Sequence, residues 1–372
     1  MRWPVWIIKT IMMILFVLNT AEAVVVDVTT TSILVEDTDA SDPLKLKQAF
    51  AQILANNTGE DILDIIQNPV FFEANISQGI KRSYFETIEP KYLPTDSSMH
   101  KYWFHVVMQE SYIAEIIKQA GFSILPHNRK EIMLWLVKET DADELIQDET
   151  SDNIASFTKS QELYYAYNDE VLMYWFKHWA QALGLVMVFP SIDEGDMLFV
   201  TPQSIKTLSF EAIEQTSNRY QLEQSLLVYM RKTADFIKLR SGFSINGGDM
   251  FIKHFQQPLT DEGVVLYSLM ADIAQKYSQE FKIGSDQLQN HTVRVEFEDI
   301  EDYDEIATIR HYLANLSVIS SFEIVSASVG QLVMNVDLII NRVEFLKMIA
   351  QDQVLLFNQD SPINRLQFIL EK

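Results

Sequence analysis

The chain has 372 residues, of which 48% are hydrophobic and 22% are charged, a composition typical of globular proteins. Asp and Glu outnumber Lys and Arg by 52 to 29, which gives a formal net charge of −23. So acidic a surface repels phosphate groups and anionic lipid headgroups, and we therefore expect neither nucleic-acid binding nor binding to a membrane surface. The chain contains no cysteine, which excludes thiol nucleophiles, thiolate zinc sites, iron–sulfur clusters and disulfides.

Residues 1–23 have the pattern of a cleavable secretory signal peptide. Basic residues precede the apolar stretch 11–18, and small residues follow at Ala21 and Ala23. This order predicts cleavage before Val24. The apolar stretch is shorter than the roughly 20 residues of a membrane-spanning helix, so a signal-anchored, membrane-tethered protein is the alternative.

The lack of cysteine also indicates a compartment. Exported eukaryotic proteins of this size usually contain disulfides, so an exported chain without any favours the bacterial periplasm. We therefore expect a periplasmic protein with no membrane attachment after signal cleavage.

Residues 24–281 alternate between strand-like and helix-like patterns, which predicts an α/β domain. The acidic segment 140–160 is predicted to be an exposed loop, and it separates two subdomains if the domain is divided. In chain order we expect a strand at 24–35, a helix that begins at Asp42 and Pro43 and is stopped by residues 56–59, and helical structure at 62–92 with a break at Pro69. A buried strand at 101–108, a helix from Ser111 to Gly121 and a strand at 132–137 follow. After the loop we expect a helix capped by Asn168 and ending at Gly184, a strand at 185–189, a helix at 210–220, strands at 225–232, 235–245 and 250–255, and a helix at 260–281.

A second domain is predicted at 287–372, after a polar linker at 282–286. Its elements follow the order βαββαβ, which is typical of the ferredoxin-like split-βαβ arrangement. The tail from Arg365 to Leu370 is predicted to add a further strand. The fold class is therefore α/β (α+β), with small α/β units followed by a ferredoxin-like C-terminal domain.

The sequence offers little catalytic chemistry. It contains no H-E-x-x-H, G-x-S-x-G, G-x-G-x-x-G or P-loop motif, so we assign no catalytic, cofactor-binding or metal-binding residues and expect no cofactor. His100 and His105 fall on opposite faces of a predicted strand, and His105 and His178 are interpreted as residues bonded within the fold. The acidic residues between Asp141 and Glu149 are interpreted as a solvated loop, with loose calcium binding as the alternative.

Short segments spread over most of the mature chain carry a family resemblance. They are the opening strand at 24–35, residues 53–59, residues 121–125 with Arg129, residues 134–136, residues 184–185 with 190–193, and Arg219-Tyr220 before residues 226–227. In this order they resemble the proteobacterial periplasmic family called domain of unknown function 2066. The resemblance implies an exported α/β protein and carries over no catalytic residue.

Three hypotheses about function follow. The first is a non-enzymatic periplasmic binding or scaffold module that engages another envelope protein through a surface of opposite charge. The second is a hydrolase of an envelope glycan that uses paired carboxylates, because two acids at a suitable spacing can come from any part of so acidic a chain. The third is the signal-anchored protein described above.

We predict that the mature protein begins at Val24, because Ala21 and Ala23 form the A-x-A cleavage motif. Intact-mass analysis of the protein purified from the envelope tests this prediction. A mass that retains residues 1–23 would favour the signal-anchored alternative instead.

Overall fold

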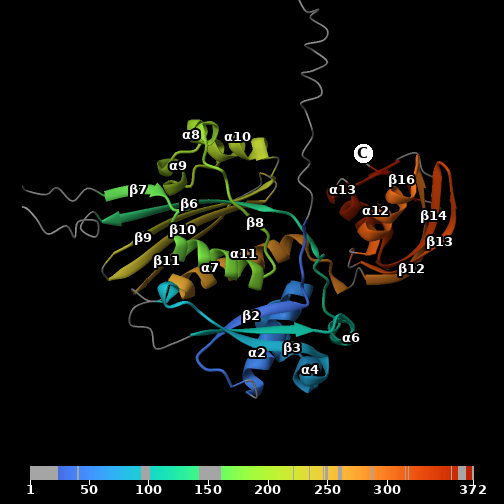
Figure 1. Ribbon diagram of the computed structural model, residues 1–372, viewed down its shortest axis with the longest axis horizontal. Helices are drawn as coiled ribbons and strands as arrows, with labels where there is room; N and C mark the ends of the chain where they lie inside the picture. The colour runs from blue at the N-terminus through green and yellow to red at the C-terminus, as the bar shows by residue number, and fades with distance from the viewer. Residues whose placement is uncertain are drawn as a thin grey trace, which may run out of the picture.

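A computed structural model describes residues 24–39, 42–93, 101–141, 161–220, 222–233, 235–245, 247, 250–258, 262–285, 288–314, 316, 318–352, 354–358 and 366–370. Within this part of the chain, helices pack on three sheets of three, six and five strands (Figure 1). A short pairing of β1 (Val24–Val25) with β5 (Asn128–Arg129) forms a fourth sheet. The predicted α/β class is confirmed.

The three-stranded sheet has the order β2-β4-β3 and is antiparallel throughout. Its strands are β2 (Thr30–Val35), β3 (Ile80–Thr87) and β4 (Tyr102–Met108), and its helices are α2 (Pro43–Thr58), α3 (Ile62–Gln67), α4 (Pro69–Glu73), α5 (Ile76–Gly79) and α6 (Glu110–Ala120). The 3₁₀ helix η1 (Pro90–Tyr92) lies between β3 and β4 in the chain. Asp42 caps α2 by accepting the Leu44 amide, and Gly59 ends this helix with a φ of 67°. Both features follow from preferences at helix ends.

The expectation of helical structure at 62–92 is wrong in its second half. The helices end at Gly79, and Ile80–Thr87 pairs as β3 with the central strand β4. Most of the β3 side chains are exposed, so this strand shows no apolar alternation and only its pairing with β4 defines it.

The six-stranded sheet has the order β11-β10-β9-β6-β7, with β8 also paired to β6. Its strands are β6 (Ile132–Asp141), β7 (Gln161–Tyr165), β8 (Met187–Val188), β9 (Gln224–Lys232), β10 (Phe236–Ile245) and β11 (Phe251–Pro258). One face packs on α7 (Glu170–Ala182) and α11 (Glu262–Phe281). The other face packs on α8 (Glu194–Phe199), α9 (Pro202–Lys206) and α10 (Phe210–Tyr220) (Figure 1).

The parallel strands β6 and β9 form the centre of this sheet. Leu134 and Leu136 belong to the core on the α7 and α11 side, whereas Met133, Trp135 and Val137 belong to the core on the α8 to α10 side. Because both faces of β6 are buried, its residues 132–137 are apolar without alternation.

Two details of the prediction change in this region. Asp169, not Asn168, caps α7, because its carboxylate accepts the Leu172 amide at 3.0 Å. The strand β7 and the helices α8 and α9 were not predicted. The segment 142–160, which holds most of the predicted acidic loop, lies outside the described residues, as do His100 and the signal segment with Ala21 and Ala23.

The five-stranded sheet follows the predicted element order but not the predicted pairing. Its elements are β12 (Leu288–Glu298), α12 (Tyr303–Ala314), β13 (Ile319–Ser328), β14 (Gln331–Ile340), α13 (Arg342–Asp352), β15 (Leu355–Phe357) and β16 (Leu366–Leu370). The strand order is β13-β14-β12-β16-β15. The tail strand β16 lies parallel to β12 and separates it from β15, so the sheet does not confirm the ferredoxin-like arrangement.

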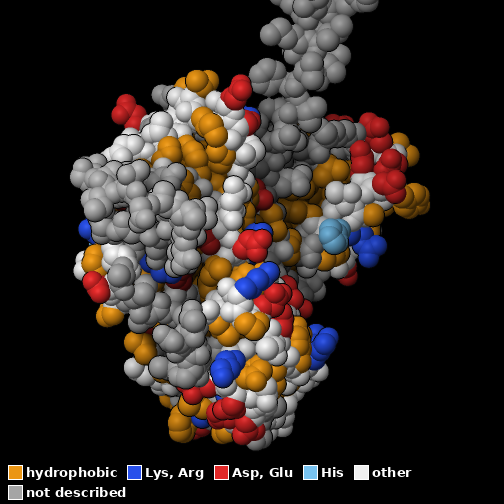
Figure 2. Space-filling view, turned by 60° about the vertical axis from the view of Figure 1, so that its left-hand side comes forward, with side chains coloured by type: hydrophobic (Ala, Val, Ile, Leu, Met, Phe, Trp, Pro, Cys, Tyr) orange, Lys and Arg blue, Asp and Glu red, His pale blue; other side chains and the backbone are white. Residues whose placement is uncertain are grey.

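The predicted linker at 282–286 is held by the preceding fold. Ile283 pairs with Ile124 through two backbone hydrogen bonds of 2.7 and 2.9 Å, and its side chain is buried. Among the helices that the structure describes, none is long and apolar enough to cross a membrane. Figure 2 shows Asp and Glu side chains on the upper, lower and right-hand parts of one face, with Lys and Arg scattered among them.

A partly buried histidine predicts a pH dependence of stability. Burial, reinforced by the charge of Arg129, lowers the pKa of His127 to about 4. This folded-state pKa lies below the unfolded value near 6.5. The stability that neutral His127 contributes is therefore complete above pH 6.5 and is lost as the pH falls toward 4. We expect His127→Asn to reduce the loss of unfolding free energy in this window, where the wild-type slope from this group is at most about 1.4 kcal/mol per pH unit.

Urea denaturation at intervals between pH 7 and 4.5 measures this slope. The exposed His254, replaced by Asn, is the matched control and should leave the slope unchanged. Equal slopes for wild type and His127→Asn would show that this burial does not govern the acid response.

Candidate functional site

Two of the histidines considered in the sequence, His105 and His178, bond within the fold. His105 lies 2.7 Å from the Ser32 hydroxyl and 3.0 Å from the Glu86 carboxylate. His178 bonds the Tyr174 carbonyl at 2.8 Å. The described part of the chain brings together no group of three or more His, Asp or Glu side chains that could hold a metal ion.

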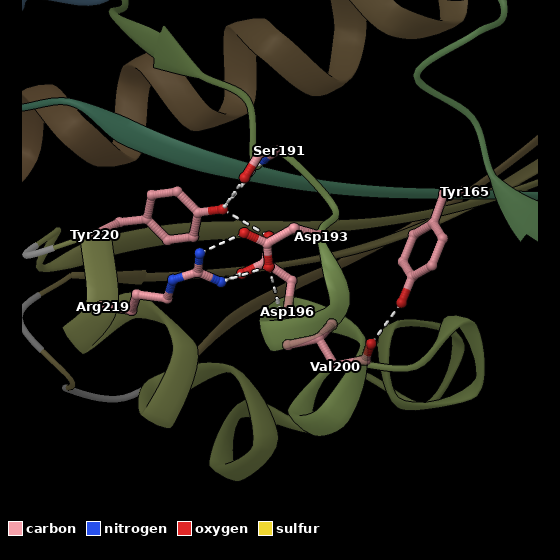
Figure 3. Close-up of polar contacts among 7 residues, drawn as sticks. All are labelled: Tyr165, Ser191, Asp193, Asp196, Val200, Arg219 and Tyr220. Carbon is pink, nitrogen blue, oxygen red and sulfur yellow. Dashed lines mark hydrogen bonds and ion pairs between the residues drawn. The ribbon is translucent and has the colours of Figure 1, made fainter.

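A cluster of polar side chains joins α8 to α10, and we call it the α8 clamp (Figure 3). Arg219, in the last turn of α10, donates from Nη1 to Asp193 at 2.6 Å and to Asp196 at 3.0 Å. Its Nη2 donates to the second oxygen of Asp193. Asp193 also caps α8 by accepting the Asp196 amide. One guanidinium therefore binds two carboxylates at the start of α8.

Tyr220 completes the clamp on the inner side of Asp196. Its hydroxyl donates to Asp196 Oδ2 at 2.6 Å and accepts the Ser191 amide at 3.1 Å. The Asp196 side chain is 1% exposed, so the hydrogen bonds from Arg219 and Tyr220 stabilise its carboxylate in place of water. At the other end of α8, the Tyr165 hydroxyl donates to the Val200 carbonyl (Figure 3).

The clamp does not have the electrostatics of a paired-carboxylate catalyst. Such a catalyst needs one carboxyl group with a raised pKa and a second that stays ionised. The bonds from Arg219 instead hold the pKa of Asp193 well below its usual range. Burial and the bond to Asp196 raise the pKa of Tyr220, so this hydroxyl keeps its proton. These bonds hold α8 against α10.

The clamp holds three consecutive hydrophobic side chains in an exposed position. Met197, Leu198 and Phe199 are 52%, 78% and 49% exposed, and we call them the α8 tip. The residues on either side, Asp196 and Val200, are 1% and 0% exposed. Figure 2 shows hydrophobic side chains gathered on the upper part of the molecule, at the height of α8 to α10 in Figure 1. Clustered exposed hydrophobic side chains commonly mark binding surfaces.

The sequence analysis included some residues of the α8 clamp but did not predict that they contact each other. Ser191, Asp193, Arg219 and Tyr220 all belong to the segments that carry the family resemblance. The structure brings the two segments together across 26 residues of chain. No spacing rule links positions so far apart. The opposite charges of Asp193 and Arg219 were the only signal available.

No known protein family, curated protein or solved structure matches the chain. The resemblance to domain of unknown function 2066 therefore stays a prediction.

We predict that Tyr220→Phe destabilises the protein by about 2 kcal/mol, because it removes a hydrogen bond to the buried charge of Asp196. Chemical denaturation measures the change. The matched control is Tyr303→Phe, whose side chain is 87% exposed and should tolerate the loss of its hydroxyl. Equal stability of the two variants would mean that the α8 clamp contributes nothing to folding.

Proposed function

We propose that this chain is a non-enzymatic periplasmic binding module that docks another envelope protein through the α8 tip. The observation that carries the proposal is the exposure of Met197, Leu198 and Phe199 on a short helix whose two ends are fixed. The domain of unknown function 2066 is the family in which we propose to place the chain.

The energetics of docking favour a surface of this kind. Complete burial of a large hydrophobic side chain contributes about 1.5 to 3 kcal/mol, so a few such residues account for much of a typical affinity. A flexible segment loses conformational entropy when it binds, and that loss offsets the gain. Arg219 and Tyr165 hold the two ends of α8 before any partner arrives, which reduces this loss.

The acidic side chains of this layer favour a partner of opposite charge. Glu194 precedes the tip on α8, and Glu211 and Glu214 lie on the neighbouring helix α10, all three with exposed side chains. The whole chain adds a net charge of −23. A complementary partner has an apolar pocket bordered by Lys or Arg, since opposite potentials accelerate association.

We predict that one envelope protein is retained by the immobilised wild-type chain and lost with the double variant Leu198→Ser/Phe199→Ser. Affinity capture from an envelope extract, followed by association kinetics of the retained protein, provides the measurement. The double variant Leu44→Ser/Leu63→Ser is the matched control, because these two leucines are each 61% exposed but lie far along the chain on α2 and α3. It should retain the partner.

Salt distinguishes the electrostatic contribution from the apolar one. The screening length falls from about 10 Å at 0.1 M to about 3 Å at 1 M, so association should slow while dissociation changes less. Retention of the partner by the tip variant, or capture of no protein by the wild type, would contradict the proposal. Saturable hydrolysis of an envelope glycan, abolished by one Asp or Glu substitution, would establish the enzyme alternative.

A further inference from the structure

A second surface lies on the five-stranded sheet, apart from the α8 tip. It is a groove of about 580 Å³ at the end of β12 and β16, and it is bordered by the turn between β13 and β14. Its principal lining residues are Asp299, Ile300, Glu301, Val329, Leu356 and Leu370. We call it the β16 groove.

Backbone hydrogen bonds fix the walls of the groove. The Gly330 amide donates to the Ile300 carbonyl at 2.8 Å, which ties the β13–β14 turn to the loop after β12. The Glu301 amide donates to the Glu305 carboxylate at 2.7 Å, and this bond holds the same loop against the first turn of α12. The groove is therefore formed by chain segments that are already linked to each other.

The lining combines apolar and acidic side chains. Ile300 and Leu370 are almost fully buried, whereas Leu356 is 49% exposed and Val329 is 97% exposed. Asp299 and Glu301 add carboxylates, and no Lys or Arg is among the described lining residues. The sequence from Glu296 to Glu305 contains seven acidic residues and no basic one. Figure 2 shows Asp and Glu side chains grouped on the right-hand lobe, on the side where Figure 1 places this sheet.

We propose that the β16 groove binds a segment of a partner protein in which Lys or Arg side chains flank a large aliphatic or aromatic side chain. The apolar lining takes up the central side chain, and Asp299 and Glu301 attract the flanking cations. This site is additional to the α8 tip and belongs to a different sheet. The groove is open on one side, which suits an extended segment of a protein better than an enclosed small molecule.

A short fluorescein-labelled peptide of alternating lysine and leucine is the probe, and fluorescence anisotropy with the full mature chain is the measurement. We expect saturable binding that weakens at least about tenfold in Asp299→Asn/Glu301→Gln and in Val329→Ser/Leu356→Ser. Asn suits position 299 because its φ is 59°, a left-handed conformation that Asn tolerates as Asp does. Thermal melts show whether each variant keeps its fold.

Three controls separate the groove from general charge attraction. Glu73→Gln/Glu110→Gln removes two exposed charges elsewhere and should bind as the wild type does. Leu198→Ser/Phe199→Ser should also bind normally, so that loss of the α8 tip and loss of the groove give different results. A peptide of alternating lysine and serine should bind at least about tenfold more weakly than the lysine–leucine peptide.

Any of four results would overturn the proposal: no saturable binding to the wild type, equal weakening by Glu73→Gln/Glu110→Gln, equal affinity for the lysine–serine peptide, or unchanged affinity in both groove variants. Displacement of the peptide by an equal concentration of spermine would also overturn it, because the site would then be one for small cations.

Discussion

Basic side chains are scarce in this chain, and the structure uses several of them at buried or partly buried carboxylates. There are 29 Lys and Arg residues for 52 Asp and Glu residues. The described ion pairs include Lys138 with Asp169 at 2.7 Å, Lys206 with Glu139 at 2.8 Å and Lys282 with Glu60 at 2.8 Å. The Glu139 carboxylate is 2% exposed, and an unpaired charge at such a position would be strongly destabilising. Cations used in this way leave the remaining acidic side chains to dominate the surface.

Arg219 pairs one cation with two carboxylates. It binds Asp193 and Asp196 together, and through them it attaches α8 to α10 on the outer face of the six-stranded sheet. The core beneath this layer is formed by residues such as Trp135 and Leu227 on β6 and β9. Because the layer is held by core packing below and by the guanidinium above, the α8 tip can stay exposed without loosening the helix that carries it.

The elements that the sequence predicted are those whose signals are local. The helix α2 has Asp42 and Pro43 at its start and Gly59 at its end, and α6 ends at Gly121 with a φ of 66°. The core strand β6 is apolar on both faces, as its sequence indicated. Each of these signals lies within a few residues of the element that it defines.

The missed elements depend on contacts between distant residues. The exposed strand β3 has no apolar period, and its pairing with β4 alone makes it a strand. The helix α8 has six residues, too few for a periodic pattern, and its end is held by Tyr165, 35 residues away. The strand β16 was predicted in the tail, but its place beside β12 comes from pairing across about 70 residues, which composition does not specify. The two proposed docking surfaces escaped prediction for a related reason. The α8 tip depends on bonds from Arg219 and Tyr165 on other elements, and the β16 groove is lined by segments far apart in the chain.

If the α8 clamp positions the α8 tip for the proposed docking, substitutions in the two are energetically coupled, and a double-mutant cycle measures that coupling. Asp193→Asn keeps the helix cap but removes a charge from Arg219, and Leu198→Ser shortens the most exposed side chain of the tip. Affinities of the retained partner for the wild type, both single variants and the double variant give the coupling between the two positions. We expect Leu198→Ser to weaken binding markedly in the wild-type background and much less in the Asp193→Asn background. Equal losses in the two backgrounds would show that the clamp and the tip act independently and that the clamp does not position the tip.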